Sequence, residues 1–316
     1  MAEKDVLIIA HRGACGYLPE HTLEAKAFAY ALGADYIEQD VVATRDDELV
    51  VLHDIHLELV TNVAERFPDR KRADGRFYAR DFDLTEIKSL NVWERRKEDG
   101  KTPVYPKRFP TGLGNFQVPT LQEEIALVQG LNRSTGRNTG IYPEIKSPAW
   151  HREEGVDLSV LVLQALEESG YKTRDDRIFL QCFDAREVRR IREDLGCELK
   201  MVQLIGENSW GESDTDYEPL KTAAGLAQLA ETVEGVGPWI GHLMRMAEID
   251  GHPVSTGFVS AAHAAGLQVH PYTFRADELA PGFESLPEMV RWFVDELKID
   301  GLFTDFTDIA LAALRS

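Results

Sequence analysis

The chain has 316 residues, of which 54 are acidic and 35 basic, so its formal net charge is −19. A protein this acidic repels nucleic acids and anionic membranes, and no apolar run approaches the ~20 residues that cross a bilayer, so neither nucleic acid binding nor stable membrane insertion is expected. A chain of this length can bury a hydrophobic core without disulfides or a structural metal ion. The three cysteines have no metal-binding spacing, and their odd number makes a disulfide framework unlikely.

Short β-rich runs alternate with amphipathic helical patterns along the chain, which is typical of repeated βα units around a parallel sheet. Strands are predicted at residues 6–10, 36–42, 141–145, 178–182, 199–204, 235–240, 268–272 and 301–304. The sixth is the weakest, because glycines and a proline interrupt it. Eight such strands close an α/β barrel, so we expect residues 1–316 to form a single (β/α)8 TIM-barrel domain.

The sequence predicts where two of the helices begin and end. Thr22 opens a helical pattern that Gly33 ends. Asp184 is predicted to cap another helix while Glu187 reaches back to the cap, which is a capping box, and Gly196 marks the end of that helix.

Residues 55–116 break this rhythm. The stretch is rich in Arg, Lys, Asp, Gly and Pro with scattered aromatic residues, and it is too long for a structureless connection. We therefore predict a small inserted subdomain after the second strand. In a barrel such an excursion emerges at the C-terminal face, where active sites lie.

Three carboxylates lie on predicted strands. Glu38 and Asp40 are two residues apart, so both point to the same face, and Glu144 lies on the third strand. Carboxylates inside a barrel are costly unless they are neutralised, and a hard divalent cation with oxygen ligands does this. The pattern indicates a metal site of three carboxylates.

Titratable and cationic side chains accompany these carboxylates. His11 and Arg12 leave the first strand, His53 follows the second, and Lys146 shares a face with Glu144. Any single pair of this kind is more often a structural ion pair than a site. Three strand ends that deliver polar residues to one rim favour a catalytic site.

Several motifs resemble the glycerophosphodiester phosphodiesterase family. The matching runs are His-Arg-Gly-Ala at 11–14, Pro-Glu-His-Thr at 19–22, Glu-Gln-Asp at 38–40, Val-Leu-His-Asp at 51–54, Pro-Glu-Ile-Lys at 143–146 and Gly-Leu-Phe-Thr-Asp at 301–305. The resemblance covers essentially the whole chain. The insertion and residues 180–183 and 269–273 are similar to the long bacterial branch, which implies a periplasmic location; the leaderless N-terminus makes the cytoplasm the alternative.

The resemblance implies roles for the residues singled out above. His11 and His53 correspond to the catalytic pair. Glu38, Asp40 and Glu144 correspond to the ligands of one divalent cation, with Ca²⁺ favoured and Mg²⁺ as the alternative.

The resemblance also assigns phosphate binding to Arg12 and Lys146. For substrate selection the candidates are Gln181, Phe183 and Tyr272, each at or just past a strand end; ordinary filling of the barrel is the other interpretation. The partners expected are small glycerophosphodiesters, and the protein is expected to be a monomer or a homodimer.

The implied reaction is the metal-dependent hydrolysis of glycerophosphodiesters, such as glycerophosphocholine and glycerophosphoethanolamine, to sn-glycerol 3-phosphate and an alcohol. One histidine would take the proton of a glycerol hydroxyl and the other would protonate the departing alcohol, through a cyclic phosphate. Which histidine acts first and which head group is preferred stay open.

Two residues depart from the family pattern. His21 stands where asparagine is commoner and Thr307 where proline is, and neither is expected to touch the catalytic residues.

Two other functions are alternatives. A lipid phosphodiesterase of sphingomyelinase D or phosphoinositide type would need an apolar or basic rim that faces the membrane, and the net negative charge argues against such a rim. A barrel that only binds would not need both histidines and all three carboxylates.

Overall fold

The barrel consists of eight parallel strands. The computed structural model describes residues 6–248 and 251–315. The barrel strands are β1 (Leu7–Ala10), β2 (Tyr36–Ala43), β4 (Gly140–Ile145), β5 (Phe179–Cys182), β6 (Lys200–Ile205), β7 (Gly235–Pro238), β10 (Gln268–Val269) and β11 (Gly301–Thr304). They follow the order β10-β7-β6-β5-β4-β2-β1-β11, which confirms the predicted architecture.

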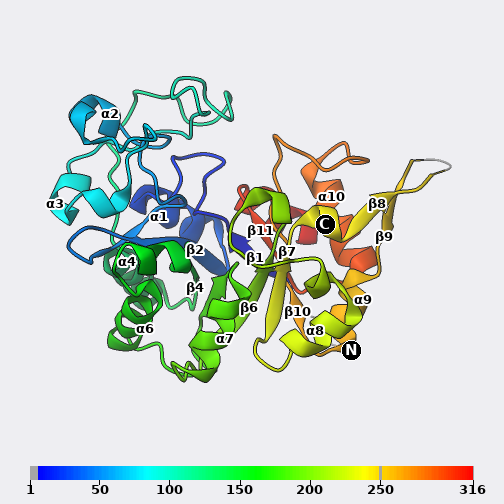
Figure 1. The fold of residues 1–316 in the computed structure, drawn as a ribbon. Coiled ribbons are helices and arrows are strands. Elements are labelled where there is room, and N and C mark those ends of the chain that lie inside the picture. The colour runs from blue at the N-terminus through cyan, green and yellow to red at the C-terminus, as the bar shows by residue number, and fades with distance from the viewer. Residues whose placement is uncertain (1–5, 249–250, 316) are drawn as a thin grey trace.

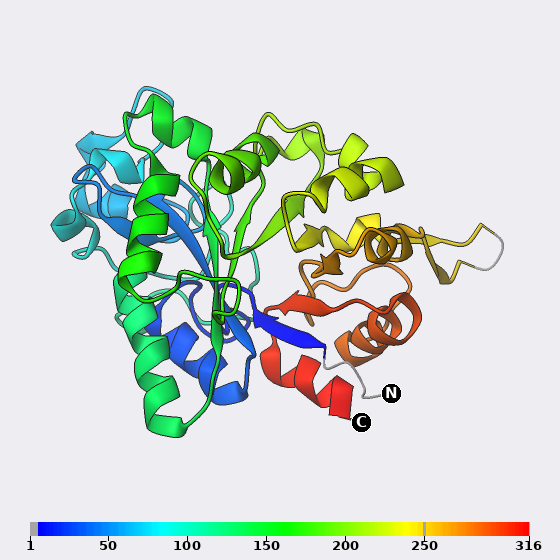
Figure 2. The ribbon, with the colours of Figure 1, turned by 90° about the horizontal axis from the view of Figure 1, so that it is seen from below.

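The barrel closes between β11 and the residues that follow β10. The Phe303 N–H donates to the Pro271 carbonyl at 3.0 Å, and the Phe274 N–H donates to the Phe303 carbonyl at 2.8 Å. On its other side β11 pairs with β1, so the first and last strands of the chain adjoin, as Figure 2 shows in blue and red. This seam brings residues near the two ends of the sequence to one place.

Helices surround the strands (Figure 2). They are α1 (Leu23–Leu32), α4 (Leu121–Thr135), α5 (Pro148–Glu153), α6 (Leu158–Glu168), α7 (Ala185–Glu193), α8 (Ala223–Leu229), α9 (Phe258–Ala264), α10 (Leu286–Trp292) and α11 (Thr307–Arg315). The predicted ends of α1 are confirmed, since the Thr22 side chain accepts from the Ala25 N–H and Gly33 ends the helix with φ 106°. Within the described residues, no helix combines the length and apolarity that a membrane span needs.

The N-terminus of α7 confirms one half of its prediction and corrects the other. Asp184 caps the helix by accepting from the N–H groups of Arg186 and Glu187 at 2.9 and 3.1 Å. The capping box was wrong, because the Glu187 carboxylate turns inward instead. There it accepts from the Ser159 hydroxyl and pairs with Arg152 at 2.6 Å. A buried carboxylate needs such partners more than the cap does.

The C-terminal half of the barrel differs in detail from the prediction. The glycine-interrupted strand exists as β7, where Gly237 leaves room for the Leu204 side chain, whose Cδ2 would lie 2.7 Å from a Cβ at this position. Regular strand β10 is shorter than predicted, so Tyr272 lies beyond it. Between them in the chain lies an antiparallel hairpin of β8 (Met244–Met246) and β9 (Pro253–Ser255), which was not predicted.

Residues 55–116 lie beside β2, where Figure 1 shows them at the upper left. They follow β3 (Leu49–Val51), which pairs antiparallel with β2, and contain the short helices α2 (Val63–Arg66) and α3 (Leu84–Ile87). Their apolar side chains pack with Val42 of β2 and Val50 of β3 in a hydrophobic cluster separate from the main core of the barrel. Apart from two 3-10 turns, Pro68–Arg70 and Ala79–Asp81, the rest of the stretch is irregular. It extends over the barrel mouth, where its arginines reach the site described next.

Candidate active site

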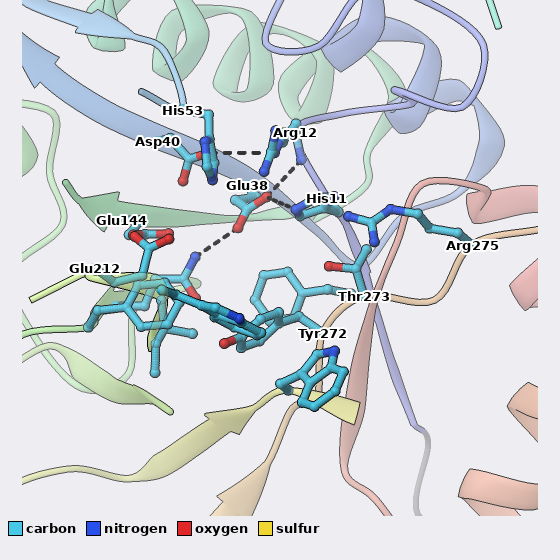
Figure 3. Close-up of a pocket in the computed structure, with 16 residues that line it drawn as sticks. His11, Arg12, Glu38, Asp40, His53, Glu144, Glu212, Tyr272, Thr273 and Arg275 are labelled. Carbon is cyan, nitrogen blue, oxygen red and sulfur yellow. Dashed lines mark hydrogen bonds and ion pairs between the residues drawn. The ribbon is translucent and has the colours of Figure 1, made fainter. Parts of the chain in front are cut away.

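A cavity of about 260 Å³ opens at the C-terminal ends of the barrel strands (Figure 3). Most of the predicted site residues line it, namely His11, Arg12, Glu38, Asp40, His53, Glu144, Gln181, Phe183 and Tyr272. Lys146 does not line the cavity. Its Nζ atom is buried and lies 2.8 Å from Glu144 Oε1.

The three predicted carboxylates meet at the base of the cavity. Glu38, Asp40 and Glu144 are at most 4% exposed, and each places a carboxylate oxygen within 4.8 Å of the others. Burial and the neighbouring Asp40 charge raise the pKa of Glu38 to about 8. Among the described residues, the buried Asp40 Oδ1 has no hydrogen-bond donor. Such crowding is unfavourable by itself, so this donor set fits a hard divalent cation.

Two donors hold Glu38 in place. The Arg12 N–H donates to Oε2 at 2.8 Å, and the Gln181 side chain donates to Oε1 at 2.9 Å (Figure 3). The Arg12 backbone has φ 55°, a conformation that a residue with a side chain rarely adopts. The backbone of the turn after β1 is therefore strained at Arg12, the residue whose N–H binds the Glu38 carboxylate.

His21 supports Asp40, which corrects the expectation that it would not touch the catalytic residues. Its Nε2 lies 2.7 Å from Asp40 Oδ2, and its Nδ1 lies 3.1 Å from Lys26 Nζ. Burial and the Lys26 charge lower the pKa of His21 to about 3, so the ring is neutral. It donates through Nε2 to Asp40 and accepts from Lys26 through Nδ1, which fixes the orientation of the carboxylate.

Each predicted catalytic histidine is paired with an aspartate through Nδ1. His11 Nδ1 lies 2.6 Å from Asp305 Oδ1, and His53 Nδ1 lies 2.6 Å from Asp54 Oδ1. Burial outweighs Asp305 and lowers the pKa of His11 to about 4, and burial with the nearby Arg12 charge lowers the pKa of His53. Burial therefore favours the neutral form of both rings, and the Nδ1 contacts with the aspartates leave each Nε2 to exchange a proton with the substrate.

Two arginines hold Asp305. The Arg108 guanidinium, which comes from the insertion, lies 2.6 Å from its Oδ2, and the Arg275 guanidinium lies 2.9 Å from the same atom. Burial opposes ionisation of Asp305, but Arg275 and His11 hold its pKa well below the ordinary range. The aspartate beside His11 is therefore a fixed anion.

A chain of ion pairs holds the other aspartate. Asp54 lies 2.6 Å from Arg95, Arg95 lies 2.6 Å from Glu20, and Glu20 lies 3.0 Å from Arg12. This network links the turn after β1 to the insertion. Its members other than Arg12 were not predicted as site residues; only the position of Asp54 beside His53 carried a sequence signal.

Aromatic side chains line the opposite part of the cavity. The predicted Phe183 and Tyr272 have ring centroids 5.9 Å apart and nearly perpendicular planes. Trp210, Trp239 and Glu212 also line it, and sequence reasoning did not find them. They follow β6 and β7 in loops without a motif.

A (β/α)8 barrel with two aspartate-oriented histidines above a buried carboxylate cluster defines a barrel phosphodiesterase. The family model described as "Glycerophosphoryl diester phosphodiesterase family" matches residues 11–309, and the chain belongs to this family.

Curated relatives agree with this assignment. A glycerophosphodiester phosphodiesterase of Haemophilus influenzae is 40% identical, over 99% of this chain and 91% of that protein. One from Treponema pallidum is 35% identical, over 98% and 91%.

Solved structures share the fold. A glycerophosphodiester phosphodiesterase from Agrobacterium tumefaciens has a TM-score of 0.62 at 20% identity, over 98% of this chain and all of that chain. An Oleispira antarctica phosphodiesterase, solved in complex with the product sn-glycerol-3-phosphate, has a TM-score of 0.66 at 18% identity, over 98% and 97%.

Proposed function

We propose that this chain hydrolyses glycerophosphodiesters to sn-glycerol 3-phosphate and an alcohol, with His11 and His53 as its acid–base pair. The observation that carries the proposal is the matched pair of histidines, each held by an aspartate at 2.6 Å beside the carboxylate cluster. The named activity of the curated relatives and the product in the Oleispira antarctica structure support the choice of substrate.

Glu38, Asp40 and Glu144 would hold one divalent cation, with Ca²⁺ as the first choice and Mg²⁺ as the alternative. When bound, such an ion neutralises charge on the phosphate oxygens. Arg12 contributes a second positive group at the same end of the pocket. Lys146 is proposed to bind a phosphate oxygen once its partner Glu144 is engaged by the cation.

The proton transfers follow from the two rings. A glycerol hydroxyl of the substrate attacks phosphorus, and one histidine accepts the hydroxyl proton through Nε2. The bond between phosphorus and the alcohol oxygen breaks, and the other histidine, in its protonated form, donates a proton to that oxygen. Water then opens the cyclic phosphate with the roles reversed. Because the nucleophile belongs to the substrate, the first step gains the advantage of an intramolecular reaction.

Release of sn-glycerol 3-phosphate from glycerophosphocholine tests the proposal. The purified enzyme is treated with a chelator and assayed without metal, with Ca²⁺ and with Mg²⁺. We expect chelation to abolish release and Ca²⁺ to restore it best. Absence of release with either ion would refute the activity, and full release without metal would refute the metal role.

Two variants test whether Glu144 is a ligand of the cation. Glu144→Gln should raise the Ca²⁺ concentration needed for half-maximal activity by at least about tenfold, since it removes a charged ligand. The exposed Glu153 offers a matched control, and Glu153→Gln should leave that concentration unaltered. Equal behaviour of the two variants would contradict the assigned site.

A further inference from the structure

The cavity has two parts of different chemistry. The part formed by β2, β4 and the residues that follow β1 and β3 carries the two histidines, Arg12 and the three carboxylates, and the proposed reaction uses all of them. The part formed by residues after β6 and β7 carries Trp210, Glu212 and Trp239, and the reaction gives none of these a role. Their presence needs a separate reason.

The two indoles form an open corner. Their ring centroids lie 5.6 Å apart and their planes meet at 73°, so they are not stacked face to face. Trp210 is 44% exposed, and the other large apolar side chains exposed in the described part of the chain do not line this cavity. Gly241 makes room for Trp239, because a Cβ there would lie 2.2 Å from the indole ring. Open indole surface at the rim of an active site indicates contact with a ligand.

Glu212, two residues after Trp210, adds negative charge to the lining of the same cavity. Its side chain is 29% exposed, and its carboxylate lies 3.7 Å from Lys146 Nζ. Lys146 lies closer to Glu144, at 2.8 Å, so it neutralises Glu212 only in part. Figure 3 shows Glu212 on the opposite side of the pocket from Arg275, whose guanidinium pairs with Asp305. A positive ligand group would therefore be attracted to the Glu212 side.

The position of the corner indicates which end of a substrate it meets. The glycerol end must lie deep, because its hydroxyl has to reach His11 or His53. The alcohol that leaves needs only its oxygen at the other histidine, so the rest of it can extend toward the exposed rim of the cavity, where Trp210 is 44% exposed. The corner therefore faces the leaving alcohol.

We propose that Trp210, Trp239 and Glu212 form a subsite for a leaving alcohol that carries an ammonium group, with choline as the best fit. A quaternary ammonium spreads its charge over methyl groups, which indole faces attract more strongly than they attract a neutral group of the same shape. The carboxylate adds Coulomb attraction. Glycerol as the leaving alcohol gains neither contribution. This inference rests on the proposed function.

Three substrates test the subsite on the wild-type enzyme. They are glycerophosphocholine, its 3,3-dimethylbutyl analogue in which carbon replaces the charged nitrogen, and glycerophosphoglycerol. We expect kcat/KM for the choline ester to exceed that of the analogue by about tenfold. Equal kcat/KM values for the choline ester and the analogue would overturn the subsite. Cleavage of both substrates would still support the proposed function. Failure to cleave any of the three would instead refute the proposed function.

Variants assign the preference to residues. Trp210→Leu and Glu212→Gln should each lower the ratio of kcat/KM between choline ester and analogue by at least about threefold, and Trp210→Phe should keep more of it. Trp150→Leu is the matched control, because Trp150 stacks on Tyr78 outside the cavity, with ring centroids 5.5 Å apart. An unchanged ratio in both Trp210→Leu and Glu212→Gln would overturn the proposal.

An inhibition measurement on the wild-type enzyme does not depend on whether a variant folds. Tetramethylammonium should inhibit the wild-type enzyme competitively against glycerophosphocholine, and neopentyl alcohol, which has a similar shape without charge, should inhibit about tenfold more weakly. Equal inhibition by the two compounds would contradict recognition of the charge.

Discussion

The Nδ1 atom of His11 lies 2.6 Å from Oδ1 of Asp305, a residue 294 positions further along the chain. The barrel seam makes this contact possible, because Ala10 on β1 is paired with Thr304 on β11 and the two polar residues come next on adjacent strands. The pairing of the first and last strands thus also brings together the His11–Asp305 pair.

Asp305→Asn should lower kcat by about 100- to 10,000-fold with little change in KM. The amide keeps the size of the side chain but no longer provides the anion that fixes the Nδ1–H tautomer of His11. Steady-state kinetics with glycerophosphocholine, together with a melting curve, would check this. A change in KM alone would contradict the positioning role.

Asp277→Asn is the matched control for that variant. Asp277 also pairs with Arg108, at 2.9 Å, but does not contact His11. We expect less than about a threefold change in kcat, in the range of a partly exposed ion pair.

His21→Ala should raise the Ca²⁺ concentration for half-maximal activity by about 10- to 100-fold, because the ring that orients Asp40 is lost. His21→Asn should retain more of the affinity, since an amide can still donate to the carboxylate. Metal titrations of activity after chelation would separate the two variants. Identical titrations of His21→Ala and the wild type would show that His21 does not support metal binding.

His53→Ala should leave less than a tenth of the wild-type kcat, as loss of a general acid–base group costs about 10²- to 10⁴-fold. His56 lies three positions further on and packs on Tyr78, with ring centroids 4.5 Å apart and outside the cavity. His56→Ala should therefore retain most of the activity. More than a tenth of normal turnover in His53→Ala would refute its catalytic role.

The parts of the site that were predictable follow from strand geometry. Side chains two apart on a strand share a face, which was enough to bring Glu38 and Asp40 together. The parallel ladder then sets Asp40 opposite Glu144 in register. Strand periodicity and the barrel rule therefore predicted the carboxylate cluster before any coordinates.

The parts that were missed depend on irregular backbone. Arg95 and Arg108 come from the insertion, where no periodicity indicates which side chains point inward. His21 reaches Asp40 because its own backbone has φ 58°, which a local pattern does not reveal. Trp210 and Trp239 follow strands in loops, and their meeting depends on how those loops fold across each other.

A second neutral histidine, away from the catalytic pair, gives a test of stability against pH. His151 on α5 is fully buried; its Nε2 accepts from the Ala43 N–H at 3.2 Å, and its Nδ1 donates to the Ser147 carbonyl at 3.0 Å. A protonated ring could not accept the Ala43 hydrogen bond. Burial, the largest cause, lowers the pKa of His151 to about 4, although the bond to Ser147 opposes this.

The sign of the effect follows from proton binding. An unfolded histidine has a pKa of about 6.5, so between pH 6.5 and 4 the unfolded chain binds the proton that folded His151 excludes. Its contribution to the free energy of unfolding is complete above about pH 6.5 and falls by about 3 kcal/mol as the pH drops to about 4. Urea unfolding of the wild type and of His151→Gln at pH 7, 5.5 and 4 would measure this. The free-energy difference between the two proteins should shrink toward acid pH. A constant difference between wild type and His151→Gln over this range would show that His151 does not titrate as the buried hydrogen bonds require.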